Sequence, residues 1–387
     1  MSAPTALEPY PYDRLGDLRA TADRHAGGCV DLSIGDPCDP PPPAAVEALG
    51  GSGAERSYPS SIGTPAFRAA AAGWLERRFG VEVASGGVMA CVGTKELVAS
   101  LPRLLQLRGH RGDTVLYPAV AYPTYAMGAR LAGLRAVPVP LEGRGRLDLG
   151  SVDPADVERS LCLWVNSPAN PTGAVDDLGA IAAWGRERGV LVCSDECYVE
   201  FVWERTRPAG AGPPLEGRTM LSTGLEGVLA LHSLSKRSNL AGLRAGFYTG
   251  DTDLVDFLAQ ARRHLGFMVP GPVQAAAAVA LDDDDHVEAQ RQRYRDRLAL
   301  LSRLLEGLGL CAPLPEGAFY LWVPAPDGDA WALAERLAVT AGMLVSPGEF
   351  YGEAGADHVR VSATVTDERL ALLADRLAAA GTPDGPR

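Results

Sequence analysis

Short apolar runs recur through the middle of the chain, and each of them ends in polar or turn-forming residues. Three such runs begin at Asp113 (DTVLYP), Leu161 (LCLWVN) and Val190 (VLVCSDE). Near-continuous hydrophobic runs of this length are typical of parallel strands that are buried on both faces. The Ala-rich stretch from Asp177 to Arg188 predicts a helix that covers them. This alternation predicts a doubly wound α/β domain, whose ligands bind at the carboxyl ends of the strands.

The pattern changes near Asp284, where a long charged segment, residues 287–306, predicts a helix. Strand-like runs follow at Ala318 (AFYLWV) and His358 (HVRVSA), with a predicted helix at 330–341 between them and another at the end. This succession predicts a separate α+β module. We therefore expect three parts: an N-terminal arm (1–45) that packs with the small domain, a large domain (46–280) and a small C-terminal domain (281–387).

Composition excludes several classes of function. The chain has 387 residues, of which 47% are hydrophobic and 22% charged, which suffices for a large buried core. Its net charge of −12, without a basic stretch, argues against nucleic acid as a partner. No run approaches the roughly 18 apolar residues of a membrane span, and the N-terminus does not resemble a signal peptide. The seven Cys include no C-x-x-C pair, which favours reduced thiols in the cytoplasm and no metal site.

Lysine is almost absent from the chain. Of the 36 basic residues, 34 are Arg and only two are Lys, namely Lys95 and Lys236. Arg stays charged, whereas Lys can lose its proton and form an imine with an aldehyde. The two lysines are therefore the first candidates for covalent chemistry.

The segment around Lys236 reads HSLSKRSNLAGLRAGF and is the most specific in the chain. It places Ser233 and Ser235 just before the lysine and Arg244 after it. Two hydroxyls and a guanidinium suit a phosphate dianion, while the amine suits an aldehyde, so the segment predicts a cofactor that carries both groups. This segment resembles the fold-type I pyridoxal-phosphate aminotransferases of class I/II.

Further motifs of that family stand in the expected order. They are VGTKE from Val92, YPAVAYPTY from Tyr117, NSPANPTG from Asn166, SDECY from Ser194 and HVRVSA from His358. The resemblance covers nearly the whole chain. It implies an α/β fold of the PLP-dependent transferase type I, with a mostly parallel sheet in the large domain and a smaller α+β domain. It also implies pyridoxal 5'-phosphate as cofactor and a homodimer.

The resemblance implies a role for each residue that matches a motif. Around the cofactor ring, Lys236 forms the Schiff base and Asp195 pairs with the pyridine nitrogen. Tyr198 and Asn170 lie at the phenolic oxygen, and Tyr122 stacks on the ring. The implied phosphate ligands are Ser233, Ser235 and Arg244, the helix start at Gly93, Thr94 and Lys95, and Tyr58 from the neighbouring subunit.

For the substrate, the resemblance implies that Arg360 and the backbone of Gly35 bind the α-carboxylate, with Asn170 nearby. The sequences of these segments are most similar to those of the actinobacterial succinyldiaminopimelate aminotransferases, as in VDLSIGDPCDPP from Val30. This implies transfer of an amino group between glutamate or 2-oxoglutarate and N-succinyl-diaminopimelate, in lysine biosynthesis. Two residues depart from the common pattern: Leu243, where an aromatic residue is usual, and Ala126, where an acidic residue is usual.

Other interpretations remain open. The same site could run elimination, replacement or oxidation in a specialised biosynthetic pathway, since these reactions share their first steps. An aminotransferase-like half of a transcription regulator would need a DNA-binding domain, for which the segment before Gly35 is too short. Lys95 could act through its backbone alone, and Asn170 and Tyr122 could serve only a turn and the core.

Overall fold

The computed structural model describes residues 10–109, 112–203 and 215–381. These residues divide into two compact units. The large unit comprises the described residues of 36–296 together with 315–319. The small unit comprises those up to Gly35, residues 297–314 and those from Tyr320 onward.

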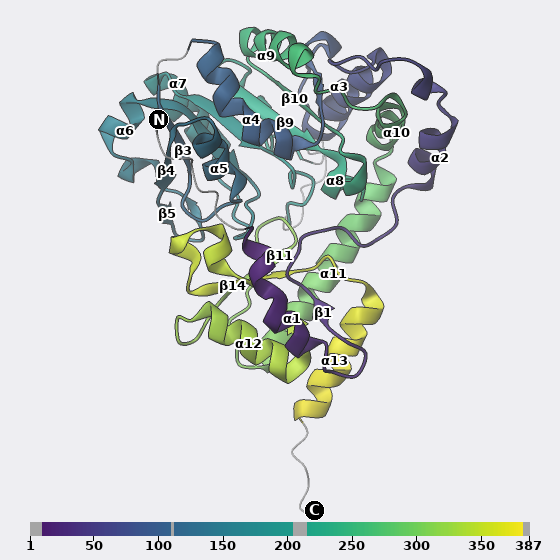
Figure 1. Cartoon of the computed structure of the whole chain (residues 1–387), viewed down its shortest axis with the longest axis vertical. Coiled ribbons are helices and arrows are strands. Elements are labelled where there is room, and N and C mark those ends of the chain that lie inside the picture. Colours follow the sequence, from purple (N-terminus) through teal and green to yellow (C-terminus); the bar gives the residue numbers. More distant parts are fainter. Residues whose placement is uncertain (1–9, 110–111, 204–214, 382–387) are drawn as a thin grey trace, which may run out of the picture. The chain divides into compact units, whose positions relative to one another are not determined.

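A seven-stranded sheet forms the centre of the large unit (Figure 1). All neighbouring strands are parallel except β10, which runs antiparallel to both β2 and β9. This mostly parallel sheet confirms the predicted α/β class. In spatial order the strands are β2 (Met89–Cys91), β10 (Gly246–Gly250), β9 (Val228–Ser233), β8 (Leu191–Asp195), β7 (Ser160–Asn166), β3 (Thr114–Pro118) and β4 (Arg135–Val139).

The three strands predicted from apolar runs are β3, β7 and β8, and each differs from its predicted bounds by only one or two residues. Their residues are buried almost throughout, because neighbouring strands and helices cover both faces. In the parallel register of β7 and β8, Asn166 lies opposite Asp195. The last residues of two central strands therefore meet at one edge of the sheet.

Helices cover both faces of this sheet (Figure 1). Successive residues of β9 point to opposite faces, so Leu229 and Leu231 join one core cluster with α4, α5 and α9, while Ala230 joins another with α3 and α10. A third cluster packs α7 against β7 and β8. The helices of this unit are α2 (Pro43–Gly51), α3 (Pro65–Phe79), α4 (Thr94–Leu107), α5 (Thr124–Leu131), α6 (Pro154–Glu158), α7 (Leu178–Arg188), α8 (Leu234–Arg237), α9 (Thr252–Leu265) and α10 (Gly271–Asp282). A small hairpin, β5 (Leu141–Glu142) with β6 (Arg146–Leu147), completes it.

The long charged helix predicted from the sequence is α11 (Asp285–Gly307), which begins in the large unit and ends in the small one. The carboxylate of Asp283 accepts hydrogen bonds from the N–H groups of Asp285 (3.0 Å) and His286 (3.3 Å). The acidic run therefore serves the start of the helix, where backbone N–H groups lack partners within it.

The small unit is built on two short sheets. One is antiparallel, in the order β11–β14–β13, and the other pairs β1 with β12 in parallel. The helix predicted at 330–341 is present with those bounds as α12. The elements are α1 (Gly16–Ala22), β1 (Val30–Asp31), β11 (Tyr320–Pro324), α12 (Ala330–Ala341), β12 (Met343–Leu344), β13 (Ser346–Pro347), β14 (His358–Ser362), α13 (Asp367–Gly381) and short 3-10 turns such as η1 (Pro11–Leu15) and η7 (Gly348–Tyr351).

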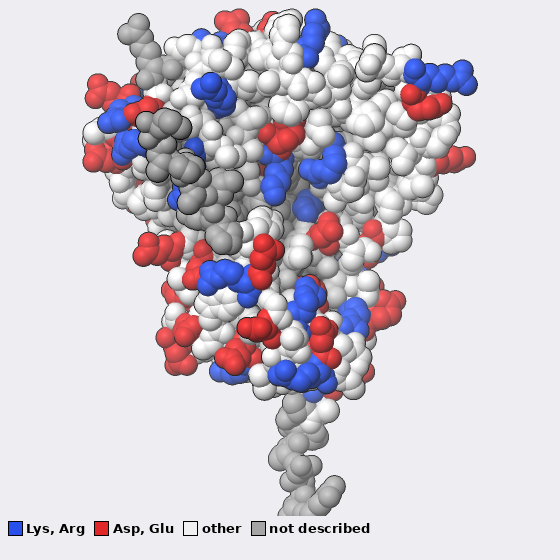
Figure 2. All heavy atoms as spheres, in the orientation of Figure 1, with Lys and Arg blue, Asp and Glu red and all other residues white. Residues whose placement is uncertain are grey.

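Charged side chains of both signs share the surface. On the face in Figure 2, Asp and Glu side chains are interspersed with Lys and Arg side chains. The net charge of −12 is thus not gathered in a single acidic area of this face. Among the described residues, no helix is both long enough and apolar enough to cross a membrane.

Gly128 lets α5 lie close against α4. A Cβ atom at this position would stand 2.9 Å from the carbonyl oxygen of Val98 and 3.2 Å from Cα of Ala99. We expect Gly128→Ala to lower the free energy of unfolding by roughly 1–3 kcal/mol, because the backbone must shift. Urea unfolding measures it. Gly50 in α2 has open space around its Cβ direction, so Gly50→Ala is the matched control and should stabilise by about 0.5–1 kcal/mol. Equal effects of the two changes would contradict the close approach.

Candidate active site

The carboxyl ends of β7, β8 and β9 bring together three of the family motifs. The side chain of Asn166, the last residue of β7, links the loop that follows it to the end of β8. Its Nδ2 donates to the carbonyl oxygen of Asp195 (2.8 Å), and its Oδ1 accepts from the backbone N–H of Asn170 (2.7 Å). Asn170 is thereby held beside the end of β8. Asn166 thus shapes the loop that carries Asn170.

Asp195 is a buried carboxylate, with 6% of its surface exposed. The hydroxyl of Tyr125 donates to Oδ2 (3.0 Å), and the backbone N–H of Cys197 donates to Oδ1 (3.3 Å). Burial raises the pKa of Asp195 above its ordinary value, and hydrogen bonds from Cys197 and Tyr125 oppose this shift. A cationic partner would therefore favour the ionised form of this carboxyl group.

The sequence pointed to Tyr122 but not to Tyr125 as a functional residue. Burial also raises the pKa of Tyr125 well above its ordinary value, so its hydroxyl keeps its proton and remains a donor. Its ring stacks on Trp164 at 5.2 Å. Tyr122 lies three residues before it, just ahead of α5, and the two ring centroids are 5.9 Å apart. The spacing of three residues was the only local signal that both could serve the same site.

Lys236 lies in α8, a single helical turn that follows β9 directly. Ser233 caps this turn, because its hydroxyl accepts from the backbone N–H of Ser235 (3.1 Å). Burial raises the pKa of the Cys197 thiol well above its ordinary value, and the charge of Lys236 acts against that shift. The thiol also lies 3.2 Å from the hydroxyl of Thr94. The structure thus gathers Thr94, Asp195, Cys197 and Lys236 in one place.

The start of α4 forms a second wall of this place. Gly93 precedes the helix with φ +70°, a conformation that favours glycine. A Cβ atom on Gly93 would lie 2.2 Å from Nη2 of Arg244, so a larger residue here would displace this guanidinium. Arg244 itself has φ +55° and donates to the carbonyl oxygen of Ala241 (2.8 Å). A helix N-terminus with an arginine beside it is a favourable site for a phosphate group.

Two further predicted residues flank this site. The Lys95 amine lies 5.9 Å from the ring centroid of the half-buried Tyr122. Tyr198 is buried, and its ring packs edge-on against Phe319 at 5.3 Å. Tyr58 is 95% exposed and is not gathered with the other residues within this chain.

Gly35 and Arg360 belong to the small unit, where Arg360 is buried in β14. Its guanidinium carbon lies 4.2 Å from the ring centroid of Tyr320 and 4.8 Å from that of Tyr351. Its Nη2 donates to the carbonyl oxygen of Ser33 and to the hydroxyl of Tyr12 (3.2 Å). These contacts fix the plane of the guanidinium, which is the condition for binding a carboxylate with two parallel hydrogen bonds.

Gly35 is also required by close approach. A Cβ atom there would lie 2.0 Å from the hydroxyl oxygen of Tyr320. Tyr320 therefore contacts both the backbone of Gly35 and the guanidinium of Arg360. The two residues that the sequence assigned to the α-carboxylate share this tyrosine as a neighbour.

Comparison with known proteins identifies the family. A sequence profile described as aminotransferase class I and II matches residues 28–377. The chain belongs to this family. The class I and II aminotransferases depend on pyridoxal 5'-phosphate, so the protein is a PLP-dependent aminotransferase whose substrates are amino acids and keto acids.

Three relatives illustrate the range within this family. The 4-dedimethylamino-4-oxo-anhydrotetracycline transaminase OxyQ of Streptomyces rimosus is 45% identical, over 96% of this chain and 99% of that protein. An LL-diaminopimelate aminotransferase of Desulforudis audaxviator is 37% identical, over 96% and 95%. The structure of a probable N-succinyldiaminopimelate aminotransferase of Thermus thermophilus has a TM-score of 0.83 at 31% identity and covers 95% of this chain and 99% of that one.

The residues of the large unit fit this cofactor. The cradle that Gly93 leaves beside Arg244, at the start of α4, offers positive charge and backbone donors for the phosphate. The buried Asp195 offers a carboxylate for a protonated ring nitrogen, and Lys236 offers the amine. Phosphate donors, carboxylate and amine are the groups that the chemistry of the aminotransferase requires.

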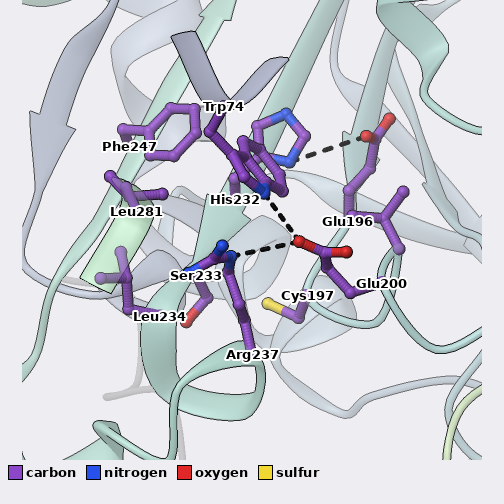
Figure 3. Close-up of a pocket in the computed structure, with 11 residues that line it drawn as sticks. Trp74, Glu196, Cys197, Glu200, His232, Ser233, Leu234, Arg237, Phe247 and Leu281 are labelled. Carbon is purple, nitrogen blue, oxygen red and sulfur yellow. Dashed lines mark hydrogen bonds and ion pairs between the residues drawn. The ribbon is translucent and has the colours of Figure 1, made fainter. Parts of the chain in front are cut away.

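A second buried acid follows Asp195 directly. Oε2 of Glu196 lies 3.7 Å from Nδ1 of His232, and both side chains are almost fully buried (Figure 3). Burial raises the pKa of Glu196 to about 7 and lowers the pKa of His232 to about 3. Below pH 7 the two side chains therefore form a neutral pair.

Replacing Tyr125 tests how the hydrogen bond from its hydroxyl affects the pKa of Asp195. In Tyr125→Phe the carboxylate loses a donor that lowers its pKa, so the acidic limb of the pH profile of kcat should move up by about one pH unit. Steady-state rates of the PLP-loaded aminotransferase over a range of pH measure the shift. Tyr248→Phe removes another buried tyrosine hydroxyl, on β10, and should leave this limb in place. An unchanged limb in Tyr125→Phe would contradict the role of this hydrogen bond.

Glu196 should make stability depend on pH. Its folded-state pKa of about 7 lies above the ordinary value of 4.5, so its contribution to stability is lost as pH rises through 7. Glu196→Gln carries no charge to bury. Between about pH 5 and pH 8 the variant should therefore gain roughly 1–3 kcal/mol relative to the wild type, as measured by urea unfolding at each pH. Parallel pH dependences of the two proteins would show that Glu196 does not titrate in this range.

Proposed function

We propose that this aminotransferase moves an amino group between glutamate or 2-oxoglutarate and the N-succinyl-diaminopimelate skeleton, as a step of lysine biosynthesis. The observation that carries the proposal is the name of two relatives. Diaminopimelate occurs in the name of the Desulforudis audaxviator protein, and N-succinyldiaminopimelate occurs in the name of the Thermus thermophilus protein. The likeness extends over 95% or more of this chain in both cases and thus includes both units.

The proposal assigns the following roles to residues of the large unit. When bound, pyridoxal phosphate supplies an aldehyde that accepts an amino group and a ring that withdraws electrons. Arg244, the start of α4, Ser233 and Ser235 hold the phosphate, and Tyr122 stacks on the ring. Asp195 keeps the ring nitrogen protonated, and Tyr198 and Asn170 hold the phenolic oxygen.

Lys236 has two successive tasks in this proposal. Its amine binds the cofactor until the amino group of the substrate displaces it. The freed amine would then take the proton from Cα of the substrate as a general base. The positive charge of Lys236 acts on Cys197 beside Asp195, which supports its placement at the ring.

In the small unit, Arg360 binds the α-carboxylate of both substrates, with the backbone of Gly35 as a further contact. The planar guanidinium between two tyrosine rings supports this role, since a fixed plane loses little freedom when the carboxylate binds. Glutamate and the succinylated substrate differ in the length of their distal ends, so other groups receive the second carboxylate.

The proposal includes a homodimer in the cytoplasm. Tyr58 would reach the cofactor phosphate of the partner subunit. Its 95% exposure in the single chain leaves the ring accessible to a partner subunit.

A second candidate is transamination of a ring ketone in a specialised pathway. The supporting observation is the 45% identity to OxyQ, over 99% of a protein whose name specifies a 4-oxo anhydrotetracycline. In this case the amino acceptor need not carry an α-carboxylate, and Arg360 would serve only the amino donor.

Half-reactions test the proposal. Glutamate should remove the visible absorption band of the PLP-loaded protein, and the N-succinylated keto acid should restore it. Arg360→Lys should raise KM for both by roughly 10- to 100-fold, because the bidentate contact is lost. Lys236→Ala is the control and should not turn over.

The outcome separates the candidates. No spectral change with glutamate or with any succinylated substrate would overturn the diaminopimelate proposal, though the cofactor would stand. Restoration of the band by a ring ketone, with the same rate in Arg360→Lys, would instead favour the second candidate.

A further inference from the structure

A buried ion pair joins the two segments that carry the proposed ring residues. Glu200 stands five residues after Asp195 and two after Tyr198, and Arg237 directly follows Lys236. Nε of Arg237 lies 3.2 Å from Oε1 of Glu200, and the two residues are only 3% and 2% exposed. Figure 3 shows the side chains of Arg237 and Trp74 converging on this carboxylate.

Every donor and acceptor of the pair is used. Oε1 of Glu200 accepts from Nε1 of Trp74 (2.7 Å) as well as from Arg237, and Oε2 accepts from Nε (3.0 Å) and Nη2 (2.8 Å) of Arg78. A carboxylate has about four acceptor positions and a guanidinium five donors. The acceptors around Arg237 are Glu200, the hydroxyl of Ser238, the carbonyl oxygens of Ala280 and Asp283, and the carboxylate of Asp284.

Glu200 is ionised in spite of its burial. Burial by itself would raise its pKa, but Arg237 and Arg78 outweigh this, and the pKa lies below its ordinary value. Asp284 and Glu288 lie 3.1 Å from Arg237 and 2.6 Å from Arg78. The cluster therefore sets two guanidiniums against three carboxylates.

Stability alone does not account for such a cluster. Buried ion pairs pay a large desolvation cost, and apolar residues of similar volume often stabilise as well or better. What the pair adds is a fixed geometry for α8. A single helical turn has little stability of its own. Arg237 ties the last residue of this turn to the end of α10 and the start of α11, and Glu200 ties it to α3.

We propose that Arg237 and Glu200 are positioning residues, which hold the backbone of Lys236 at a set distance from Asp195 and Tyr198. The inference rests on the proposed role of Lys236. The lysine amine must alternate between cofactor and substrate, so its side chain has to move while its backbone stays in place. An error of about 1 Å in such a group costs up to 100-fold in rate.

The test uses the PLP-loaded variants Arg237→Met and Glu200→Gln. We expect kcat for glutamate to fall by roughly 10- to 100-fold, with KM changed less than about twofold. We also expect the pH at which the visible absorption of the resting protein changes to shift, because this pH reports the surroundings of the lysine amine. Arg237→Lys, which keeps the charge and one contact, should recover part of both.

Ile181→Ala is the matched control, since it opens a buried cavity in α7, away from α8. The inference is overturned if Arg237→Met and Glu200→Gln keep kcat within about twofold of the wild type and leave the pH midpoint of the absorption titration in place. It is also overturned if the two variants lose only stability, as Ile181→Ala does. Should Arg237→Met not fold, Arg237→Lys and Glu200→Gln carry the same comparison. Borohydride reduction and peptide mapping of the wild type locate the cofactor: a label elsewhere than Lys236 overturns the proposed role of that lysine and this inference with it.

Discussion

The burial of the Asp195 carboxyl group is the constraint on which the rest of the site depends. A buried charge is tolerated only where donors and opposite charges surround it. The end of β8 meets this condition with the hydroxyl of Tyr125 and the N–H of Cys197. The pKa of Asp195 is still raised by burial, so the carboxylate has a strong preference for a cationic partner. The proposed ring nitrogen satisfies this preference.

The two acids that follow Asp195 along the chain have pKa values shifted in opposite directions by their surroundings. Glu196 faces a neutral imidazole and has a raised pKa, whereas Glu200 faces two guanidiniums and has a lowered one. Three carboxyl groups within six residues therefore serve different ends: Asp195 faces the site, Glu196 stays protonated below pH 7, and Glu200 anchors α8. Environment decides the state of each, as it does wherever neighbouring titratable groups share a buried region.

The family and the cofactor can be inferred from features that all members of the family need. The substrate cannot be inferred from these features. A phosphate cradle, a buried carboxylate and a lysine are common to enzymes that act on very different amino acids and ketones. The relatives accordingly range from a diaminopimelate aminotransferase to OxyQ. Discrimination among substrates depends on groups at the distal end, whose contacts differ from one member to another.

Local patterns in the sequence determined the strands β3, β7 and β8, the helices α7, α11 and α12, and the set of motif residues around Lys236. These features depend on neighbours a few positions away, through burial, helical spacing and the chemistry of a single side chain. Because the chain has only two lysines, the candidates for the residue that forms the imine were limited to Lys95 and Lys236. The domain boundaries and the roles of individual site residues stay predictions, although the structure does bring Thr94, Asp195 and Lys236 together.

Only the tertiary structure decided which side chains support that set. Tyr125 lies 70 residues from Asp195, and Trp74 lies 126 residues from Glu200. In the sequence Arg237 was one of 34 arginines, with nothing to mark it apart from its place after Lys236. A hydrogen bond between residues so far apart leaves no periodicity or motif, because its partners meet only when helices and strands pack. The sequence therefore predicted the residues proposed to act in the chemistry, whereas the side chains that hold them in place were found only in the folded structure.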